Sequence, residues 1–184
     1  MNTDQIATWI ALLRGINVGG KNKLPMRELA AMFAAAGCES VQTYIQSGNV
    51  VYEAGPDLGP LVPALIADEI EEQFGYRIPL VVRTLQEFED VAKRNPFLGD
   101  GDAPDGMHVA FLADVPSQSR VAQLDQDRSP LDVFLVSGRE IFLHCPNGMG
   151  RTKLTNAYFD STLATTSTIR NWRTVLALLR LAQG

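Results

Sequence analysis

The chain has 184 residues, 46% hydrophobic and 20% charged, a composition typical of soluble globular proteins with one large domain or two small ones. No apolar run is long enough to span a bilayer, and the N-terminus lacks the pattern of a signal peptide. The net charge of −5 makes general nucleic-acid binding unlikely, and two cysteines are too few for a disulfide framework. We therefore expect a cytoplasmic protein with no membrane association.

The first part of the chain alternates strand and helix signals. Six elements are predicted, with strands at about 9–15, 41–45, 50–53 and 78–83 and helices at about 25–36 and 61–74. The pair Gly48-Asn49 between two β-branched runs indicates a tight hairpin. The sequence Thr84-Leu-Gln-Glu87 is a capping box that opens another helix, ending at about residue 94.

The second part repeats this order after a segment rich in proline, glycine and aspartate, which predicts a linker at 95–106. Its predicted strands are at 107–112, 131–136, 140–144 and 167–170, and its helices at about 117–126, 153–163 and 171–182. Asn171 is the predicted cap of the last helix.

The repeated order predicts an α+β fold of two subdomains. Each is β-α-β-β-α-β, the ferredoxin-like split arrangement, followed by a helix, with antiparallel or mixed sheets. The predicted division is 1–94, a linker at 95–106, and 107–184. Sequence identity between the halves is negligible, so the repeat is one of architecture only.

The segment 14–23, Arg-Gly-Ile-Asn-Val-Gly-Gly-Lys-Asn-Lys, directly follows the first predicted strand. Gly19 and Gly20 allow positive φ, and Arg14 and Lys21 can meet a phosphate or carboxylate. It is not a Walker loop, because the serine or threonine that must follow the lysine is absent. Two interpretations stay open: an anion-binding loop, or a strand-to-helix connection that needs glycine for its geometry.

These residues also identify a family resemblance. The opening RGINVGGKN, the Pro25-Met26 helix start, the turn in TYIQSGNVV and the later TIRNWRTV resemble the domain-of-unknown-function family sixteen-ninety-seven. The resemblance runs nearly end to end. It implies a small bacterial protein with an α+β fold of two subdomains and no established activity, and it carries over no functional residues.

The segment 144–152, His-Cys-Pro-Asn-Gly-Met-Gly-Arg-Thr, resembles the loop H-C-x-x-G-x-x-R-[ST] of cysteine-dependent phosphatases. Such an enzyme needs a thiolate, an arginine that clamps phosphate and a hydroxyl that assists the leaving thiolate. Cys145, Arg151 and Thr152 have that spacing, and Asp114 is the candidate general acid. A plain strand-to-helix turn with an apolar cysteine explains the same residues, and phosphate binding without catalysis is favoured over turnover.

We expect a site for a small phosphorylated ligand such as a nucleotide or sugar phosphate. Its predicted residues are Arg14, Asn17, Gly19, Gly20, Lys21 and Gln46 from the first half and Arg151, Lys153, Arg170 and Arg173 from the second. Arg170 and Arg173 flank the start of a helix, where a cation opposes the helix dipole, so they hint at function.

The alternatives are a Cys145 phosphatase and a protein-interaction module without a small-molecule site. No cofactor is expected. No metal is expected either, because His108 and His144 are too few for the usual ligand spacings. Oligomeric state cannot be read from the sequence.

Overall fold

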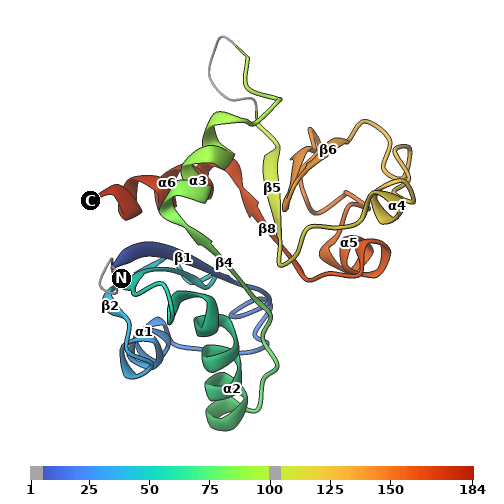
Figure 1. Cartoon of the computed structure of the whole chain (residues 1–184). Coiled ribbons are helices and arrows are strands. Elements are labelled where there is room, and N and C mark those ends of the chain that lie inside the picture. The colour runs from blue at the N-terminus through green and yellow to red at the C-terminus, as the bar shows by residue number, and fades with distance from the viewer. Residues whose placement is uncertain (1–5, 100–104) are drawn as a thin grey trace. The chain divides into compact units, whose positions relative to one another are not determined.

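The structure is a computed structural model that describes residues 6–99 and 105–184, and it forms two compact units (Figure 1). Of the described residues, the first unit comprises 6–90 and 177–184, and the second comprises 91–99 and 105–176. The predicted division placed the whole C-terminal helix in the second half, whereas its last residues belong to the first unit. Residues 100–104 of the predicted linker lie outside the described residues.

Unit 1 contains an antiparallel sheet of strand order β2-β3-β1-β4. Its strands are β1 (Ala7–Leu13), β2 (Glu39–Tyr44), β3 (Asn49–Ala54) and β4 (Leu80–Thr84). Its helices are α1 (Met26–Ala35), the 3-10 turn η1 (Gly59–Leu61), α2 (Val62–Phe74) and the first part of α3 (Leu85–Lys93). The end of α6 (Trp172–Gln183) completes the unit.

Unit 2 contains a second antiparallel sheet, of order β6-β7-β5-β8. Its strands are β5 (Met107–Leu112), β6 (Val133–Ser137), β7 (Glu140–His144) and β8 (Ser167–Asn171). Its helices are α4 (Gln118–Val121), α5 (Asn156–Leu163) and the beginning of α6. The α+β class and the repeated β-α-β-β-α-β order are therefore confirmed, and both sheets are wholly antiparallel.

Two predicted helices are shorter than expected. The helix predicted at 117–126 is only α4, which Ser117 caps; beyond it the N–H groups of Gln123 and Leu124 bond three residues back, and the N–H of Asp125 donates to the Tyr158 hydroxyl (2.7 Å). The helix predicted from residue 153 begins at Asn156. The preceding N–H of Lys153 donates to the Ser129 hydroxyl, at 3.1 Å.

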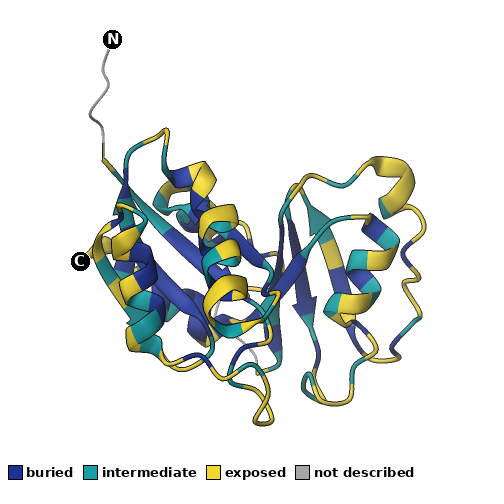
Figure 2. Ribbon diagram, turned by 90° about the horizontal axis from the view of Figure 1, so that it is seen from below, coloured by how far each residue is buried: buried dark blue, intermediate teal, exposed yellow. Residues whose placement is uncertain are grey.

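The core of unit 1 lies between its sheet and helices α1 and α2, where the helices turn buried sides to the strands (Figure 2). Leu29 and Phe33 of α1 and Ile66 and Ile70 of α2 are buried. The two residues of each pair are four positions apart, the spacing that puts side chains on one helix face. Burial of this apolar stripe is what holds both helices to the sheet.

Two predicted helix starts are confirmed by hydrogen bonds. In the capping box before α3, the N–H of Glu87 donates to Thr84 Oγ1 (3.2 Å), and the N–H of Thr84 donates to Glu87 Oε2 (2.9 Å). At α6, the N–H of Thr174 donates to Asn171 Oδ1 at 2.8 Å. Both caps are local in sequence, and they fix where helices follow β4 and β8.

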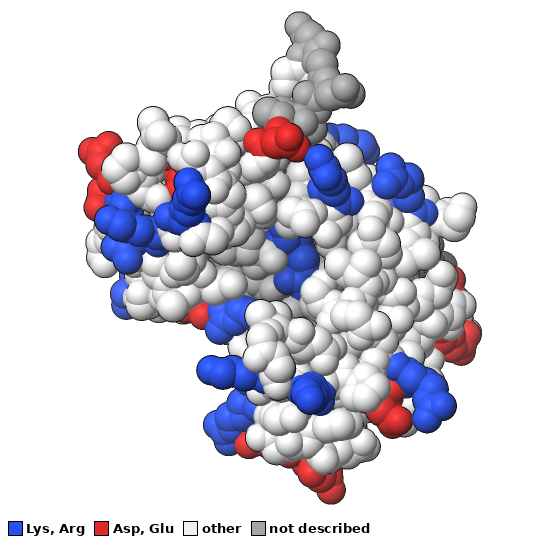
Figure 3. All heavy atoms as spheres, turned by 180° about the vertical axis from the view of Figure 1, so that it is seen from behind, with Lys and Arg blue, Asp and Glu red and all other residues white. Residues whose placement is uncertain are grey.

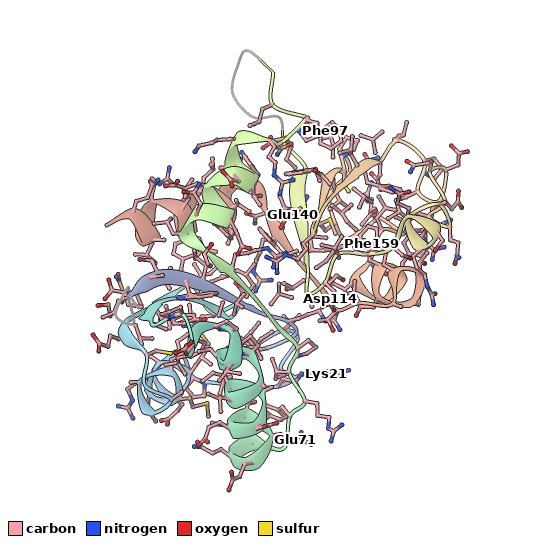
Figure 4. The ribbon with its side chains drawn as sticks, viewed as in Figure 1. Lys21, Glu71, Phe97, Asp114, Glu140 and Phe159 are labelled. Carbon is pink, nitrogen blue, oxygen red and sulfur yellow. The ribbon has the colours of Figure 1, made fainter. Side chains whose placement is uncertain are left out.

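The core of unit 2 is smaller and lies between its sheet and helices α4 and α5. Phe159 of α5, labelled in Figure 4, packs edge-on against Phe134 of β6 with ring centroids 6.2 Å apart. Cys145 belongs to the same cluster. Helix α5 ends at Ala164, which adopts the left-handed conformation, and β8 follows three residues later. The N-terminal ends of α5 and α6 therefore both flank β8.

Candidate functional site

The opening loop of unit 1 folds into a small hairpin. The N–H of Lys21 donates to the carbonyl of Val18 (3.0 Å), and the N–H of Asn17 donates to the carbonyl of Asn22 (3.1 Å). The two residues at the tip, Gly19 and Gly20, have φ of 57° and 77°. Positive φ at both central positions defines the type I′ turn that two-residue hairpins favour. The paired glycines are therefore explained by the turn itself.

Asn17 uses its side chain to close this hairpin against the rest of the unit. Its Nδ2 donates to the carbonyls of Leu24 (2.8 Å) and Gln46 (3.0 Å), and its Oδ1 accepts from the N–H of Leu24 (2.8 Å). These bonds use both amide groups of the side chain. Asn17 thus ties the hairpin to the β2–β3 turn, and Gln46 contributes its backbone carbonyl.

The β2–β3 turn is also packed directly onto this loop. The turn has four residues, Ile45–Gly48, and so begins one residue earlier than the predicted connection at 46–49. A Cβ at Gly48 would lie 2.6 Å from Leu13 Cβ and 2.9 Å from Ile16 Cδ1, and its φ is +76°. Only glycine fits there. The two sequence segments that stand out in the first half therefore form one structural bracket.

The cations Arg14 and Lys21 of the opening loop differ in how far they are exposed. Lys21 is exposed at the hairpin (Figure 4), and Arg14 is half-buried, directly after β1. The N–H of Arg14 donates to the carbonyl of Pro79 at 3.0 Å. Of the predicted ligand residues in unit 1, Asn17, Gly19, Gly20 and the backbone of Gln46 thus have a clear role in the fold, whereas Lys21 and Gln46 are both exposed.

The phosphatase interpretation of Cys145 is not supported by the geometry. Cys145 is fully buried, and burial, with a smaller contribution from Asp132, raises the pKa of its thiol to about 11. A nucleophilic cysteine needs an accessible thiol with a lowered pKa. The N–H groups of Gly148 and Arg151 donate to the carbonyls of Cys145 and Gly148, so they form turns rather than a phosphate cradle.

Of the other proposed catalytic groups, Thr152 hydrogen-bonds to Cys145 and opposes the rise of its pKa without reversing it, whereas Arg151 and Asp114 are not brought to the thiol. Thr152 Oγ1 accepts from the N–H of Leu154 at 3.0 Å, and Arg151 is exposed. Asp114 follows the end of β5, whereas Cys145 bonds to Gly106 at its start. At about 3.3 Å per residue, the strand separates the two by roughly 20 Å. Figure 4 shows Asp114 and Phe97 at opposite ends of β5, and Phe97 contacts His144 beside the cysteine.

Unit 2 has a cavity at the start of β5, with two adjoining parts. One part, of about 280 Å³, is lined by Asp105, Gly106, Met107, His108, Gly148, Met149, Asn171, Trp172 and Arg173. The other part, of about 380 Å³, is lined by His108, Met149, Thr155, Asn156, Ile169 and Asn171. His108, Met149 and Asn171 are shared, so the two parts meet at these side chains.

Helix termini supply most of the polar lining. Thr155 and Asn156 are the cap and first residue of α5, and Asn171 caps α6. His108 lies on β5, and its Nδ1 is 3.0 Å from the carbonyl of Gly106. Burial lowers the pKa of His108, while that backbone contact opposes the shift. The imidazole is therefore neutral at pH 7, with the proton on Nδ1 and an acceptor at Nε2.

The predicted residues of the second half are only partly brought together. Arg173 lines the cavity and Arg151 and Lys153 lie in the exposed segment between two of its walls. Arg170 is instead buried in β8, where its guanidinium donates to Thr168 Oγ1 (2.8 Å) and to the carbonyl of Ile169 (3.0 Å). Burial lowers the pKa of Arg170 to about 10, well inside the charged range at pH 7.

Sequence reasoning missed His108, Thr155 and Asn156 as lining residues. His108 was considered only as a metal ligand. The signal for the other two was the cap pattern at the start of α5, which was obscured because that helix was predicted to begin earlier. A polar residue that caps a helix can also contact a ligand, because the N-terminal end of that helix lines the cavity.

Comparison with known proteins places the chain in a family. The family model described as Protein of unknown function (DUF1697) matches residues 6–142, more than half of the chain. The chain belongs to this family. A conserved bacterial protein, SP0830 from Streptococcus pneumoniae, has a similar fold, with a TM-score of 0.65 and 21% sequence identity over 97% of this chain and 99% of that one. No curated protein matches the chain.

Two kinds of site are absent from the described ranges. Within residues 6–99 and 105–184, no three His, Cys, Asp or Glu side chains are grouped to hold a metal ion, and no helix is long and apolar enough to cross a membrane. Figure 3 shows one face, on which Lys and Arg side chains form several groups and Asp and Glu side chains are fewer and lie mainly toward the rim.

Proposed function

We propose that this DUF1697 protein binds a small phosphorylated ligand, of the sugar phosphate class, in the cavity of unit 2. The observation that carries the proposal is that two helix N-termini, those of α5 and α6, line one cavity together with Arg173. Helix N-termini carry partial positive charge and unpaired N–H groups, and both favour an anion.

The hydrogen-bonding capacity of the lining favours an acceptor-rich ligand. Asn156 Oδ1 accepts from Ser167 Oγ (3.0 Å), and Asn171 Oδ1 accepts from the N–H of Thr174 (2.8 Å). Within the described residues, the Nδ2 group of each asparagine has no protein partner. The spare groups of both side chains are therefore donors, and the oxygens of a phosphate are acceptors.

Arg173 forms an exposed ion pair with Asp105 at the cavity. Its Nη2 lies 2.9 Å from Asp105 Oδ1, and both side chains are about nine-tenths exposed, at 88% and 92%. Exposed ion pairs contribute little to stability, so a phosphate can replace Asp105 as the partner of Arg173 at small cost. The carboxylate of Asp105 repels an anion. When a phosphate replaces Asp105 as the partner of Arg173, that carboxylate no longer pairs with the guanidinium.

His108 supports a ligand with an organic part. Its Nε2 is the acceptor among the polar groups where the two parts of the cavity meet. Bound inorganic phosphate leaves the larger part empty, whereas a hydroxyl beside the phosphate can donate to Nε2. The uncharged lining of that part, Met149, Thr155, Asn156 and Ile169, suits a sugar or polyol better than a second charge.

The test is a titration calorimetry panel of inorganic phosphate, a hexose phosphate, a nucleoside monophosphate and the unphosphorylated hexose. We expect the hexose phosphate to bind most tightly. Arg173→Ala should weaken it about tenfold, the effect of losing one charge-assisted contact. Arg77→Ala is the matched control, because Arg77 also forms an exposed ion pair, with Glu71 in unit 1.

Asn156→Asp separates binding from folding. An aspartate is favourable in the first turn of a helix, but it stands near Asp160, whose carboxylate also accepts from Ser167 Oγ (2.7 Å), so we expect a small loss of stability in a chain that still folds, which urea unfolding verifies. The added negative charge should repel the ligand and abolish binding. Heat release with none of the four compounds, or binding that both Arg173→Ala and Asn156→Asp leave unchanged, contradicts the proposal.

A further inference from the structure

The two sheets differ at corresponding edge strands. In unit 1 the edge strand β2 pairs irregularly with β3, with a register shift between Glu39 and Gln42. Ser40, inside that shift, has φ +49° and donates to Glu53 Oε2. Bulges and charged side chains are the devices by which edge strands avoid pairing with other chains. Strand β2 has both.

Strand β6, the corresponding edge of unit 2, has neither (Figure 1). It pairs with β7 in regular register over all of Val133–Ser137, and none of these residues is charged or proline. The alternate residues Leu131, Val133 and Leu135 are exposed by 75%, 47% and 46%. An edge that is regular, apolar and exposed is a template for another strand.

The end of this strand also shows strain without burial. Leu131 has φ +75°, a conformation that a leucine rarely adopts and that costs about 1 kcal/mol or more. Its side chain remains in solvent within its own unit. On the other side of β6, an apolar groove of about 460 Å³ is lined by Val115, Pro116, Val121 and Val136. Apolar surface therefore flanks the strand on both sides.

We propose that β6 pairs with β6 of a second copy of this chain, antiparallel, about a two-fold axis at Leu135. Such an axis places Leu135 opposite its own copy, Val133 opposite Ser137, and Phe134 opposite Val136. In a two-fold interface any charge near the axis meets an equal charge. Strand β6 carries no charge, so self-pairing meets no repulsion along its length.

The residues beyond the strand favour the same arrangement. Asp132 precedes β6 and Arg139 follows it by two residues. Antiparallel pairing about Leu135 places Asp132, which is buried in its own unit and accepts from Ser129 Oγ (2.6 Å), opposite the uncharged Gly138 of the other copy, so no like charges meet at the strand ends. A second copy thus matches the strand in shape and in hydrophobicity, and the pairing brings no like charges together.

Sedimentation equilibrium from micromolar to millimolar concentration tests the dimer. We expect a concentration-dependent dimer that Leu135→Lys weakens by about tenfold or more, because two ammonium groups then meet at the axis. Leu135 is nearly half exposed, so lysine fits the folded unit, and circular dichroism verifies this. Gln42→Lys, on the exposed edge of β2, is the matched control and should leave the association unchanged.

A cysteine cross-link tests the register. Directly opposed residues of an antiparallel pair have Cα atoms about 4.5–5.5 Å apart, within disulfide range. Under oxidant, Leu135→Cys should give a covalent dimer, whereas Gln42→Cys should not, and the native Cys38 and Cys145 are buried. A monomer at all concentrations, or a dimer in which Leu135→Cys fails to cross-link, overturns the proposal.

Discussion

The opening loop of unit 1 and the cavity of unit 2 are both built from glycine, asparagine and cations, yet they use their polar groups differently. In the loop, both the amide nitrogen and the amide oxygen of Asn17 form hydrogen bonds to the surrounding backbone. In the cavity, the side-chain oxygens of Asn156 and Asn171 accept hydrogen bonds within the fold, and their amide nitrogens are left to donate to a ligand. Residue type therefore does not distinguish a binding loop from a structural one, and the hydrogen-bond partners do.

The largest effect that would sharpen this contrast is expected at Gly48. In Gly48→Ala the new methyl meets Leu13 and Ile16 and the residue must hold φ +76°, so we expect a loss of about 2–4 kcal/mol in the free energy of unfolding. Gly19→Ala is the control, since its φ is +57° but nothing lies within 4 Å. It should lose only about 1 kcal/mol.

Urea unfolding followed by circular dichroism measures both variants. Equal losses at the two glycines would mean that backbone conformation, rather than the contact between the β2–β3 turn and the opening loop, sets the requirement. In that case the packing of Gly48 against Leu13 and Ile16 would contribute nothing to the stability of the turn.

The next effect is expected at Asn17. Asn17→Ala removes three hydrogen bonds and places alanine at φ +54°, so the free energy of unfolding should fall by about 2–3 kcal/mol. Ligand binding in unit 2 should be unaffected. Asn156→Asp should show the reverse, with binding lost and only a small loss of stability from the nearby Asp160 carboxylate.

Calorimetric titration and urea unfolding of the same two proteins make that comparison. If Asn17→Ala weakens binding of the hexose phosphate as strongly as Asn156→Asp does, the loop is part of a site after all. The distinction drawn from hydrogen-bond partners would then be wrong.

Local signals predicted the fold well, because they act over a few residues. The capping box at Thr84 and the cap at Asn171 set helix starts through bonds that span three residues. The path of the chain after α4 was not predictable in this way, since the N–H of Asp125 donates to the Tyr158 hydroxyl, 33 residues away. The contact between Gly48 and Leu13 is likewise tertiary. The sequence predicted a turn at Gly48. It did not show that Leu13 and Ile16 leave no room for a side chain there.

The site was harder to predict for the same reason. Arg170 and Arg173 are near neighbours in sequence, but one ends buried in β8 and the other exposed at the cavity, because strand and helix meet between them. His108 carries no motif around it. Its relevance comes from the walls that α5, α6 and the segment at Met149 build beside it, and none of these is adjacent in the chain.

The smallest effect, and the one that reports on the cavity without a ligand, is the pH dependence set by His108. Burial lowers the pKa of His108 in the folded chain below its ordinary value of 6.5. Below pH 6.5 the unfolded chain therefore binds a proton that the folded chain does not yet hold, so the free energy of unfolding is undiminished above pH 6.5 and falls as the pH decreases below it.

In His108→Gln this part of the pH dependence should vanish, which urea unfolding between about pH 7.5 and pH 5 can show by difference from the native chain. The same neutral imidazole is what a ligand hydroxyl needs as an acceptor, so the affinity for a hexose phosphate should also fall as His108 becomes protonated. Binding that strengthens on acidification would instead mean that the imidazolium contacts the phosphate. His108 would then belong with Arg173 as an anion-binding group, not with the uncharged groups of the larger part.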